Sequence, residues 1–428
     1  MNILILNTFE TKGGAAVAGK RLTVALQKQG IQVSLLVMEK KTSDTFVSAI
    51  GTSVFRKLLT KWAFLSERLQ IFLTNRFHRE NLFSVSTGSS GACILHHPLV
   101  KKADIIHLHW INQGFLSLQD IHALIDLGKP IVWTMHDMWP CTGICHHARD
   151  CSRYLENCGN CMFLHTPSVK DLSYRVFQKK KQYLSNSDLW FVTCSRWLRL
   201  LAEKSAIKSG NHFYNIPNPI DTDFFCPGNQ KTARQLLKLP ENKKLILFGA
   251  SIASDKRKGV DYLIEATYLL SDLKDEVELI FCGQVKGELS ATFGLKAHAL
   301  GYVSDPEMVV KMYQAADCFV IPSLEENLPN MIMEAMACGI PCVGFNTGGI
   351  PEMIKHQETG YVAQYKSAED LASGIRSLLE KCDDLSFKKN IRTFVLENYS
   401  ESIIAKRYIQ LYTNALKSKN SGTIKKAE

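Results

Sequence analysis

Hydrophobic and polar positions along the chain alternate between two kinds of segment. Short apolar runs such as Ile3 to Asn7 and Ile31 to Met38 are typical of strands that are buried on both faces. Between them, Ala15 to Gln29 has the apolar period of a helix and ends at Gly30, a common helix stop. This order predicts the beginning of a doubly wound parallel sheet.

The same alternation continues and restarts once. Further strands are expected at residues 104–108, 131–135, 189–193, 244–248, 278–282, 318–321 and 341–345. Asn215 to Asp221 holds two prolines and no helical period, so it is expected to be a linker. The prediction is an α/β protein with two Rossmann-like domains at 1–216 and 217–400. Segment 401–428 adds a helix from Ser402 to Leu416 and a tail that is expected to be disordered from Lys417.

Composition narrows the class of protein. A length of 428 residues suits two domains, and 46% hydrophobic with 21% charged residues is typical of a soluble chain. No apolar run reaches the roughly 18 residues of a membrane span, and the N-terminus lacks a basic leader, so a cytoplasmic location is expected. The net charge of +10 favours phosphorylated substrates or a membrane surface, because no basic tract resembles a nucleic-acid module.

Residues 322–349 carry the most chemistry. Glu326 precedes a loop that Pro329 closes, and Glu334 lies in the helix that follows. A helix N-terminus favours an anion, so a nucleotide diphosphate could bind the backbone near Asn327 and Leu328 while Glu334 accepts ribose hydroxyls. An amphipathic helix with one solvated glutamate is the alternative.

This run resembles the signature of the group 1 glycosyltransferases, in which two glutamates with seven residues between them precede Ala-Met-Ala-Cys-Gly-x-Pro. The resemblance implies a retaining enzyme with the GT-B fold: two Rossmann-like domains that face across a cleft, and a C-terminal helix that returns to the N-terminal domain. It places the acceptor side in the first domain and the nucleotide sugar in the second. The run His136-Asp-Met-Trp-Pro, followed by cysteines, is similar to a subset of bacterial polysaccharide enzymes.

A second stretch supports the resemblance. Asp255-Lys-Arg-Lys-Gly-Val-Asp resembles the family's Lys-Gly-x-Asp motif, whose lysine binds the donor diphosphate, and Lys258 matches that lysine. Ile252 stands where the family usually has an arginine, so Arg257 or Lys256 is expected to supply the second cation. Without the resemblance, three adjacent cations would indicate a solvated turn.

The first strand is followed by Gly13 and Gly14. Glycine lets the backbone approach a ligand, and the family places a glycine-rich loop here, facing the donor phosphates and the acceptor. A simple turn is the alternative, and these two residues are taken as donor-site candidates.

Three histidines lie at the ends of predicted strands in the first half. His136 comes after Ile131 to Met135, at the sheet edge where α/β proteins bind ligands, and the matching histidine of the family points at the transferred sugar. A packed structural histidine is the alternative. His107 and His109 either line the acceptor side or fill space near Trp110.

Four cysteines form a cluster, Cys145, Cys151, Cys158 and Cys161. Only the last two have the spacing of a zinc knuckle, so the pattern indicates a structural zinc with free thiols and disulfides as alternatives. Four thiolates leave no open position on the metal, so such a zinc would stabilise a loop and would not catalyse.

The segment from Val54 to Glu80 mixes aromatic and aliphatic residues with six cations, which are Arg56, Lys57, Lys61, Arg68, Arg76 and Arg79. An amphipathic helix of this kind suits an anionic lipid surface, and core packing of a helix pair is the equal alternative.

Taken together, the residues and the resemblance predict transfer of a sugar from a nucleoside diphosphate sugar to a glycan hydroxyl, with retention. Lys258 and the helix N-terminus would stabilise the departing diphosphate. Glu326 would orient the sugar, and the donor phosphate would help deprotonate the acceptor. No Asp-x-Asp is placed like a metal–nucleotide motif, so no catalytic metal is expected.

The expected acceptor is a glycan of a cell-surface polysaccharide, and a lipid-linked one if the segment from Val54 to Glu80 docks on the inner face of the membrane. The rival hypotheses are a nucleotide-sugar epimerase or hydrolase of the same fold, and a non-catalytic sugar-binding scaffold that zinc stabilises.

Overall fold

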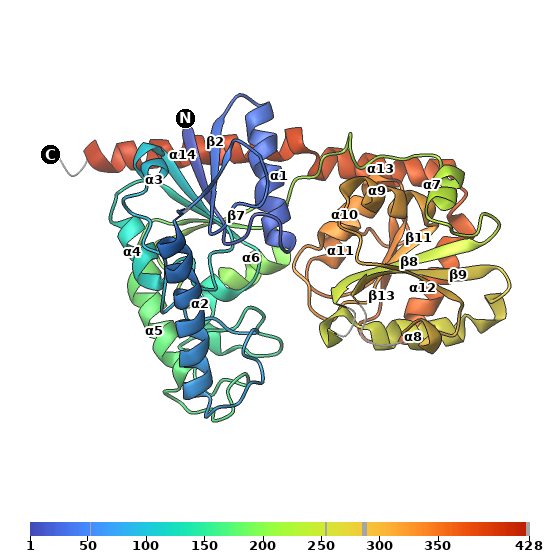
Figure 1. Ribbon diagram of the computed structural model, residues 1–428, viewed down its shortest axis with the longest axis horizontal. Coiled ribbons are helices and arrows are strands. Elements are labelled where there is room, and N and C mark those ends of the chain that lie inside the picture. The colour runs from blue at the N-terminus through green and yellow to red at the C-terminus, as the bar shows by residue number, and fades with distance from the viewer. Residues whose placement is uncertain (52, 253–254, 285–288, 425–428) are drawn as a thin grey trace. The chain divides into compact units, whose positions relative to one another are not determined.

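The computed structural model describes residues 1–51, 53–252, 255–284 and 289–424 (Figure 1). Contacts divide the chain into two compact units. The N-terminal unit holds residues 1–219 and the chain from Ile404 onward, and the C-terminal unit holds Ile220–Ile403. The sequence placed the corresponding boundaries a few residues earlier, at 216/217 and 400/401. No helix among the described residues is long and apolar enough to cross a membrane.

The N-terminal unit is built on a parallel sheet with seven strands in its described part, ordered β3-β2-β1-β4-β5-β6-β7. The strands are β1 Asn2–Leu6, β2 Gln32–Val37, β3 Val47–Ala49, β4 Ile105–Leu108, β5 Ile131–Met135, β6 Trp190–Thr193 and β7 His212–Asn215. The helices are α1 Gly14–Lys28, α2 Val54–Thr74, α3 Pro98–Lys102, α4 Leu118–Ile125, α5 Leu172–Leu184, α6 Arg196–Ala202 and, from Ile404 on, α14 Glu401–Ile424. Two short 3₁₀ helices, η1 Trp139–Cys141 and η2 Arg153–Leu155, follow β5.

Alternation along the strands gives this sheet two cores. Ile3 and Ile5 face one core, which α1 and α14 cover, whereas Leu4 and Leu6 face the other, which includes residues of α4 and α5. The predicted return of the C-terminal helix to this unit is therefore confirmed. Predicted disorder from Lys417 is wrong as far as Ile424, because a helix already nucleated on the sheet propagates at little cost.

The C-terminal unit has a second parallel sheet, with six strands in the described residues, ordered β10-β9-β8-β11-β12-β13. They are β8 Lys244–Ile252, β9 Val277–Gln284, β10 Ala297–Gly301, β11 Cys318–Ile321, β12 Cys342–Phe345 and β13 Gly360–Ala363. The helices are α7 Gln230–Leu236, α8 Val260–Leu269, α9 Pro306–Ala315, α10 Asn330–Ala337, α11 Ile350–Met353, α12 Ala368–Lys381 and α13 Leu385–Tyr399. The 3₁₀ helices are η3 Lys256–Lys258, η4 Ser271–Leu273 and η5 Leu289–Thr292. Two doubly wound sheets, as predicted, are confirmed.

Candidate functional site

The loops after β8 and β11 meet where the strand order of the second sheet changes direction. β8 pairs with both β9 and β11, although the chain forms β9 and β10 before β11. Open α/β sheets bind ligands at the carboxyl ends of the strands at such a point. Lys258 follows β8 in η3, Glu326 follows β11, and their side chains form an ion pair.

Backbone packing holds these two loops together. The N–H of Leu324 donates to the carbonyl of Arg257 at 2.7 Å. Gly259 has φ +65°, and a Cβ atom there would lie 1.8 Å from the carbonyl oxygen of Pro322. No side chain fits in that contact, so glycine is required for the two loops to approach.

The loop after β12 closes on the same place. A Cβ atom on Gly348, which has φ +56°, would lie 1.7 Å from the carbonyl oxygen of Glu326. The N–H of Gly349 donates to the carbonyl of Asn327 at 2.9 Å, and Ser323 donates to the Glu326 carboxylate at 3.1 Å. Three loops therefore fix the position of Glu326.

Arg257, the expected second phosphate cation, is engaged within its own turn. Its guanidinium donates to both carboxylate oxygens of Asp255, at 2.7 and 3.1 Å, and these hydrogen bonds raise the pKa of Arg257. The bidentate pair orients the arginine beside Lys258.

Glu334 lies inside α10 and is only 8% exposed. The hydroxyl of Tyr313, from α9, donates to its carboxylate at 2.8 Å. The N-terminus of α10 has no side-chain cap, and Asn327 and Leu328 just before it are buried. Backbone N–H groups of the first turn are thus the donors that an anion would meet there.

In the N-terminal unit the strand order changes direction between β1 and β4. Gly13 follows β1 with φ +89° as the N-cap of α1, and Gly14 is the first residue of that helix. A Cβ atom on Gly13 would meet nothing within 4 Å, so the glycine is needed here for its backbone conformation and not for space. Gly19, further along α1, lies against the ring of His109, and a Cβ atom on this glycine would lie 3.4 Å from Nδ1 of that ring.

His136 sits at the end of β5, and its Nε2 lies 2.9 Å from Nδ1 of His109, at the end of β4. Burial lowers the pKa of His136 to about 4 and that of His109 well below its ordinary value, so both rings are neutral at pH 7. The two histidines form one hydrogen-bonded pair at the edge of the sheet.

His107 has a structural role. Its ring is fully buried, with Nδ1 at 2.7 Å from the Tyr412 hydroxyl of α14 and Nε2 at 2.7 Å from the Thr134 hydroxyl. Of the two alternatives left open for His107, space filling in the core is the observed one, and it ties α14 to the sheet.

A neighbouring carboxylate was missed by the sequence analysis. Asp137 accepts hydrogen bonds from the Trp110 indole at 2.9 Å, the Trp139 N–H at 2.9 Å and the His146 ring at 2.7 Å. Burial alone would raise its pKa, but His146 and the hydrogen bonds outweigh it and hold the pKa of Asp137 below the usual range. The signal was its place in Trp-Thr-Met-His-Asp, beside His136.

The four clustered cysteines line one cavity of about 20 Å³ as free thiols. Burial raises the pKa of Cys145, Cys158 and Cys161 to about 12. In the part of the chain that the structure describes, no group of three or more His, Cys, Asp or Glu side chains is arranged to hold a metal ion. Zinc at Cys145, Cys151, Cys158 and Cys161 stays a prediction, which requires the thiols to draw together.

The structure thus gathers the expected residues into two sets, one in each unit. Lys258, Arg257 and Glu326 lie together beside Asn327 and Leu328 at the start of α10 in the C-terminal unit. Gly13, Gly14 and His136 lie at the carboxyl edge of the N-terminal sheet.

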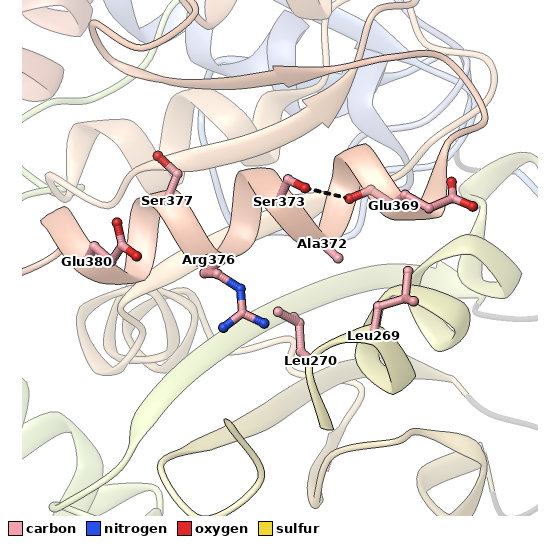
Figure 2. A pocket seen from close by; sticks show the side chains of 8 residues that line it. All are labelled: Leu269, Leu270, Glu369, Ala372, Ser373, Arg376, Ser377 and Glu380. Carbon is pink, nitrogen blue, oxygen red and sulfur yellow. Dashed lines mark hydrogen bonds between the residues drawn. The ribbon is translucent and has the colours of Figure 1, made fainter. Parts of the chain in front are cut away.

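Two other pockets lie away from these residues. One of them, drawn in Figure 2, lies between the end of α8 and α12, and Arg376 is among the residues that line it. Its volume is about 400 Å³, and Arg376 is ion-paired with Asp272. A larger pocket of about 750 Å³ lies at the amino ends of β1 and β2 and includes Asn2 and Gln32. Neither pocket is lined by a residue that the sequence predicted for the functional site.

Comparison with protein families gives two matches. Residues 12–224 match the family described as Glycosyltransferase Family 4, and residues 229–394 match the family described as Glycosyl transferases group 1. The second match contains Lys258, Glu326 and Glu334.

Curated relatives are glycosyltransferases. The chain is 28% identical over 280 residues to "D-inositol 3-phosphate glycosyltransferase" of Corynebacterium aurimucosum, covering 61% of this chain and 63% of that protein. It is 31% identical over 195 residues to "N,N'-diacetylbacillosaminyl-diphospho-undecaprenol alpha-1,3-N-acetylgalactosaminyltransferase" of Campylobacter jejuni, covering 42% of this chain and 50% of that protein. The chain thus spans between half and two thirds of the length of these two relatives.

Solved structures share the fold over nearly the whole chain. Sucrose-phosphate synthase from Thermosynechococcus elongatus superposes with a TM-score of 0.68 at 18% identity, covering 97% of this chain and 99% of that one. Alr3699/HepE of Anabaena, solved in complex with UDP-glucose, gives 0.62 at 15% identity, covering 97% of this chain and 100% of that one. The predicted GT-B fold is confirmed.

Proposed function

The chain belongs to the group 1 glycosyltransferases, and from this we propose that it transfers a sugar from a nucleoside diphosphate sugar to a hydroxyl group of a glycan, with retention of configuration. The observation that carries the proposal is the Lys258–Glu326 pair at the strand-order change, beside the uncapped N-terminus of α10. This arrangement offers a cation and backbone N–H groups to a diphosphate.

The donor diphosphate would bind at Lys258 and the start of α10. Lys258 is paired with Glu326, so an incoming phosphate would take over part of the ammonium group and release Glu326 toward the sugar hydroxyls. Glu334, held by Tyr313, keeps acceptor capacity for the ribose, because a carboxylate accepts more than one hydrogen bond. A nucleotide as the donor group is supported by the solved HepE complexes with UDP and UDP-glucose.

Departure of the diphosphate builds negative charge, which Lys258 would stabilise without reorganising. We propose that the donor phosphate takes the proton of the acceptor hydroxyl on the same face of the sugar, which retains the configuration. His136, neutral and oriented by His109, would contact the transferred sugar as a hydrogen-bonding group and not as a cation. Divalent metal is expected to be dispensable.

The acceptor we propose is a lipid-linked glycan in the synthesis of a cell-surface polysaccharide, used at the inner face of the membrane. Support comes from the Campylobacter relative, whose name specifies a diphospho-undecaprenol acceptor. The alternative to a lipid-linked acceptor is a soluble glycan.

The test uses purified protein, a panel of nucleoside diphosphate sugars and the variants Lys258→Ala and Glu334→Gln. Thermal shift identifies the donor, and each variant should bind it about ten- to a hundredfold more weakly because one charge-assisted contact is lost or weakened. Turnover by Lys258→Ala should fall further, because the leaving group is no longer stabilised. Lys274→Ala is the matched control, since Lys274 is an exposed lysine of the same unit outside the donor loops.

Wild-type turnover by Lys258→Ala would rule out the assigned role. Nucleotide release at the same rate with and without acceptor would favour a hydrolase. Epimerisation of the donor sugar would favour an epimerase. Donor binding with no transfer to any acceptor would favour a scaffold. Activity that survives EDTA is expected.

A further inference from the structure

Helix α2 has apolar residues on two faces, and the described residues of the N-terminal unit cover only one of them. Ala63 and Ile71 are buried on the inner face. The opposite face is open, with Trp62 64% exposed, Leu65 55% and Leu69 50%. In Figure 1 the helix runs along the N-terminal unit in blue.

Buried polar contacts fix the rotation of this helix. Glu67 accepts from the N–H groups of Thr87 at 2.7 Å and Gly88 at 2.8 Å. Arg68 pairs with Glu67 at 2.8 Å and donates to the carbonyl of Val85 at 3.0 Å. Turning α2 to bury its outer face would break the hydrogen bonds to Thr87, Gly88 and Val85 and leave buried polar groups without partners, which is unfavourable. Arg68 is therefore structural and is not available to a ligand.

The outer face forms a continuous stripe, which we call the α2 stripe. Its members recur every three or four residues, as one side of a helix requires, and are Phe55, Leu58, Trp62, Leu65, Leu69 and Leu73. At 1.5 Å per residue the α2 stripe is about 27 Å long. Apolar surface of this extent on a soluble protein marks a contact with another phase or partner.

Charge beside the α2 stripe selects the occupant. Lys57 and Lys61 are exposed along the helix, and Arg76 and Arg79 are exposed just after it. The single acidic residue of α2, Glu67, is buried, so no carboxylate of this helix faces outward. A convex helix face with cations at its margin suits a flat, negatively charged surface better than it suits a groove.

We propose that α2 docks on an anionic lipid bilayer, with the α2 stripe among the acyl chains near the headgroups and Lys57, Lys61, Arg76 and Arg79 at the lipid phosphates. This docking does not depend on the proposed glycosyl transfer, so a protein that failed to transfer sugar would still bind vesicles. If both hold, docking brings the enzyme to a lipid-linked acceptor.

Co-sedimentation of the full chain with vesicles tests the proposal. Vesicles of phosphatidylcholine with phosphatidylglycerol should bind the protein, and vesicles of phosphatidylcholine alone should bind it much less. Reversing two charges in Lys57→Glu/Lys61→Glu should weaken binding roughly thirtyfold or more, as expected for loss of two lysines at an anionic surface. The triple change Trp62→Ser/Leu65→Ser/Leu69→Ser should weaken it at least as much, because three apolar side chains that would enter the bilayer are lost.

Matched controls carry the same chemical changes elsewhere in the N-terminal unit. Lys101→Glu/Lys102→Glu on α3 and Leu127→Ser/Leu200→Ser alter exposed side chains outside α2 and should bind as wild type does. Equal binding of the α2 variants and the wild type would overturn the proposal, as would failure of the wild type to bind anionic vesicles. A concentration-dependent dimer in light scattering that the triple change abolishes would assign the α2 stripe to a second copy of the chain instead.

Discussion

Single glycine residues position the charged groups of the donor loops. The spaces where side chains of Gly259 and Gly348 would stand are filled by the carbonyl groups of Pro322 and Glu326. Both glycines also have positive φ, which other residues adopt only with strain. Lys258 and Glu326 meet because the backbones of three loops can come this close.

We predict that Gly259→Ala destabilises the C-terminal unit by at least about 2 kcal/mol and weakens donor binding, because strain at positive φ adds to a collision with Pro322. Gly301→Ala is the matched control, since Gly301 has nearly the same φ, +67°, and open space around its Cβ position. The control should lose only about 1 kcal/mol. Chemical unfolding followed by circular dichroism makes the comparison, and equal losses in the two variants would refute the steric explanation.

At the scale of elements, the loop after β5 has four clustered thiols and a buried lysine nearby, and a bound metal would explain both. Four thiols surround one small cavity, and Lys180 of α5 is buried beside them, with its ammonium 3.5 Å from the centre of the Trp139 ring and 3.0 Å from the carbonyl oxygen of Thr142. Burial lowers the pKa of Lys180 to about 7. A tetrathiolate zinc would carry a net negative charge and would favour the charged form of this lysine.

The zinc prediction is therefore specific. Protein prepared without chelator should contain about one zinc per chain by elemental analysis, and both Cys158→Ser and Cys161→Ser should lose it. Cys93→Ser is the control, because Cys93 is an exposed thiol outside the cluster. Metal-free wild-type protein in which the four clustered cysteines are reduced would leave the free-thiol alternative.

At the scale of the whole molecule, the N-terminal unit is closed by a segment from the other end of the chain. Tyr408 and Tyr412 of α14 are buried against Thr134 and His107, so the core of this unit is complete only when residues some 270 to 300 positions apart have met. The buried histidines in this core couple its stability to pH.

We predict that the N-terminal unit becomes less stable as pH falls from about 6.5 toward 4. Burial lowers the pKa of His107 to about 3 and of His136 to about 4. In this window the unfolded chain binds protons that the folded chain does not. The free energy of unfolding therefore decreases as the pH is lowered. The loss is up to about 1.4 kcal/mol per pH unit for each histidine.

Tryptophan fluorescence measures this transition selectively, because all six tryptophans lie in the N-terminal unit. Urea unfolding at pH 7, 6 and 5 should give a steep pH dependence for the wild type and a shallower one for His107→Gln. His96→Gln, a change of an exposed histidine, should keep the wild-type slope. A pH-independent wild type would contradict the prediction.

The order of residues along the chain was enough to predict the two parallel sheets and the residues at their carboxyl ends. Strand and helix periods are local, and the motifs around Lys258 and Glu326 follow directly after strands, so their place at a sheet edge could be read from their order. What each polar side chain contacts became known only from the folded chain. His107 is a core residue because α14 lies on it, and Arg68 is structural because the backbone around Val85 receives it. The outer face of α2 is open because its rotation is fixed by Glu67 from the other side. Burial depends on segments distant in the chain, so the face of α2 that holds Glu67 and Arg68 is buried, whereas the more apolar face is open.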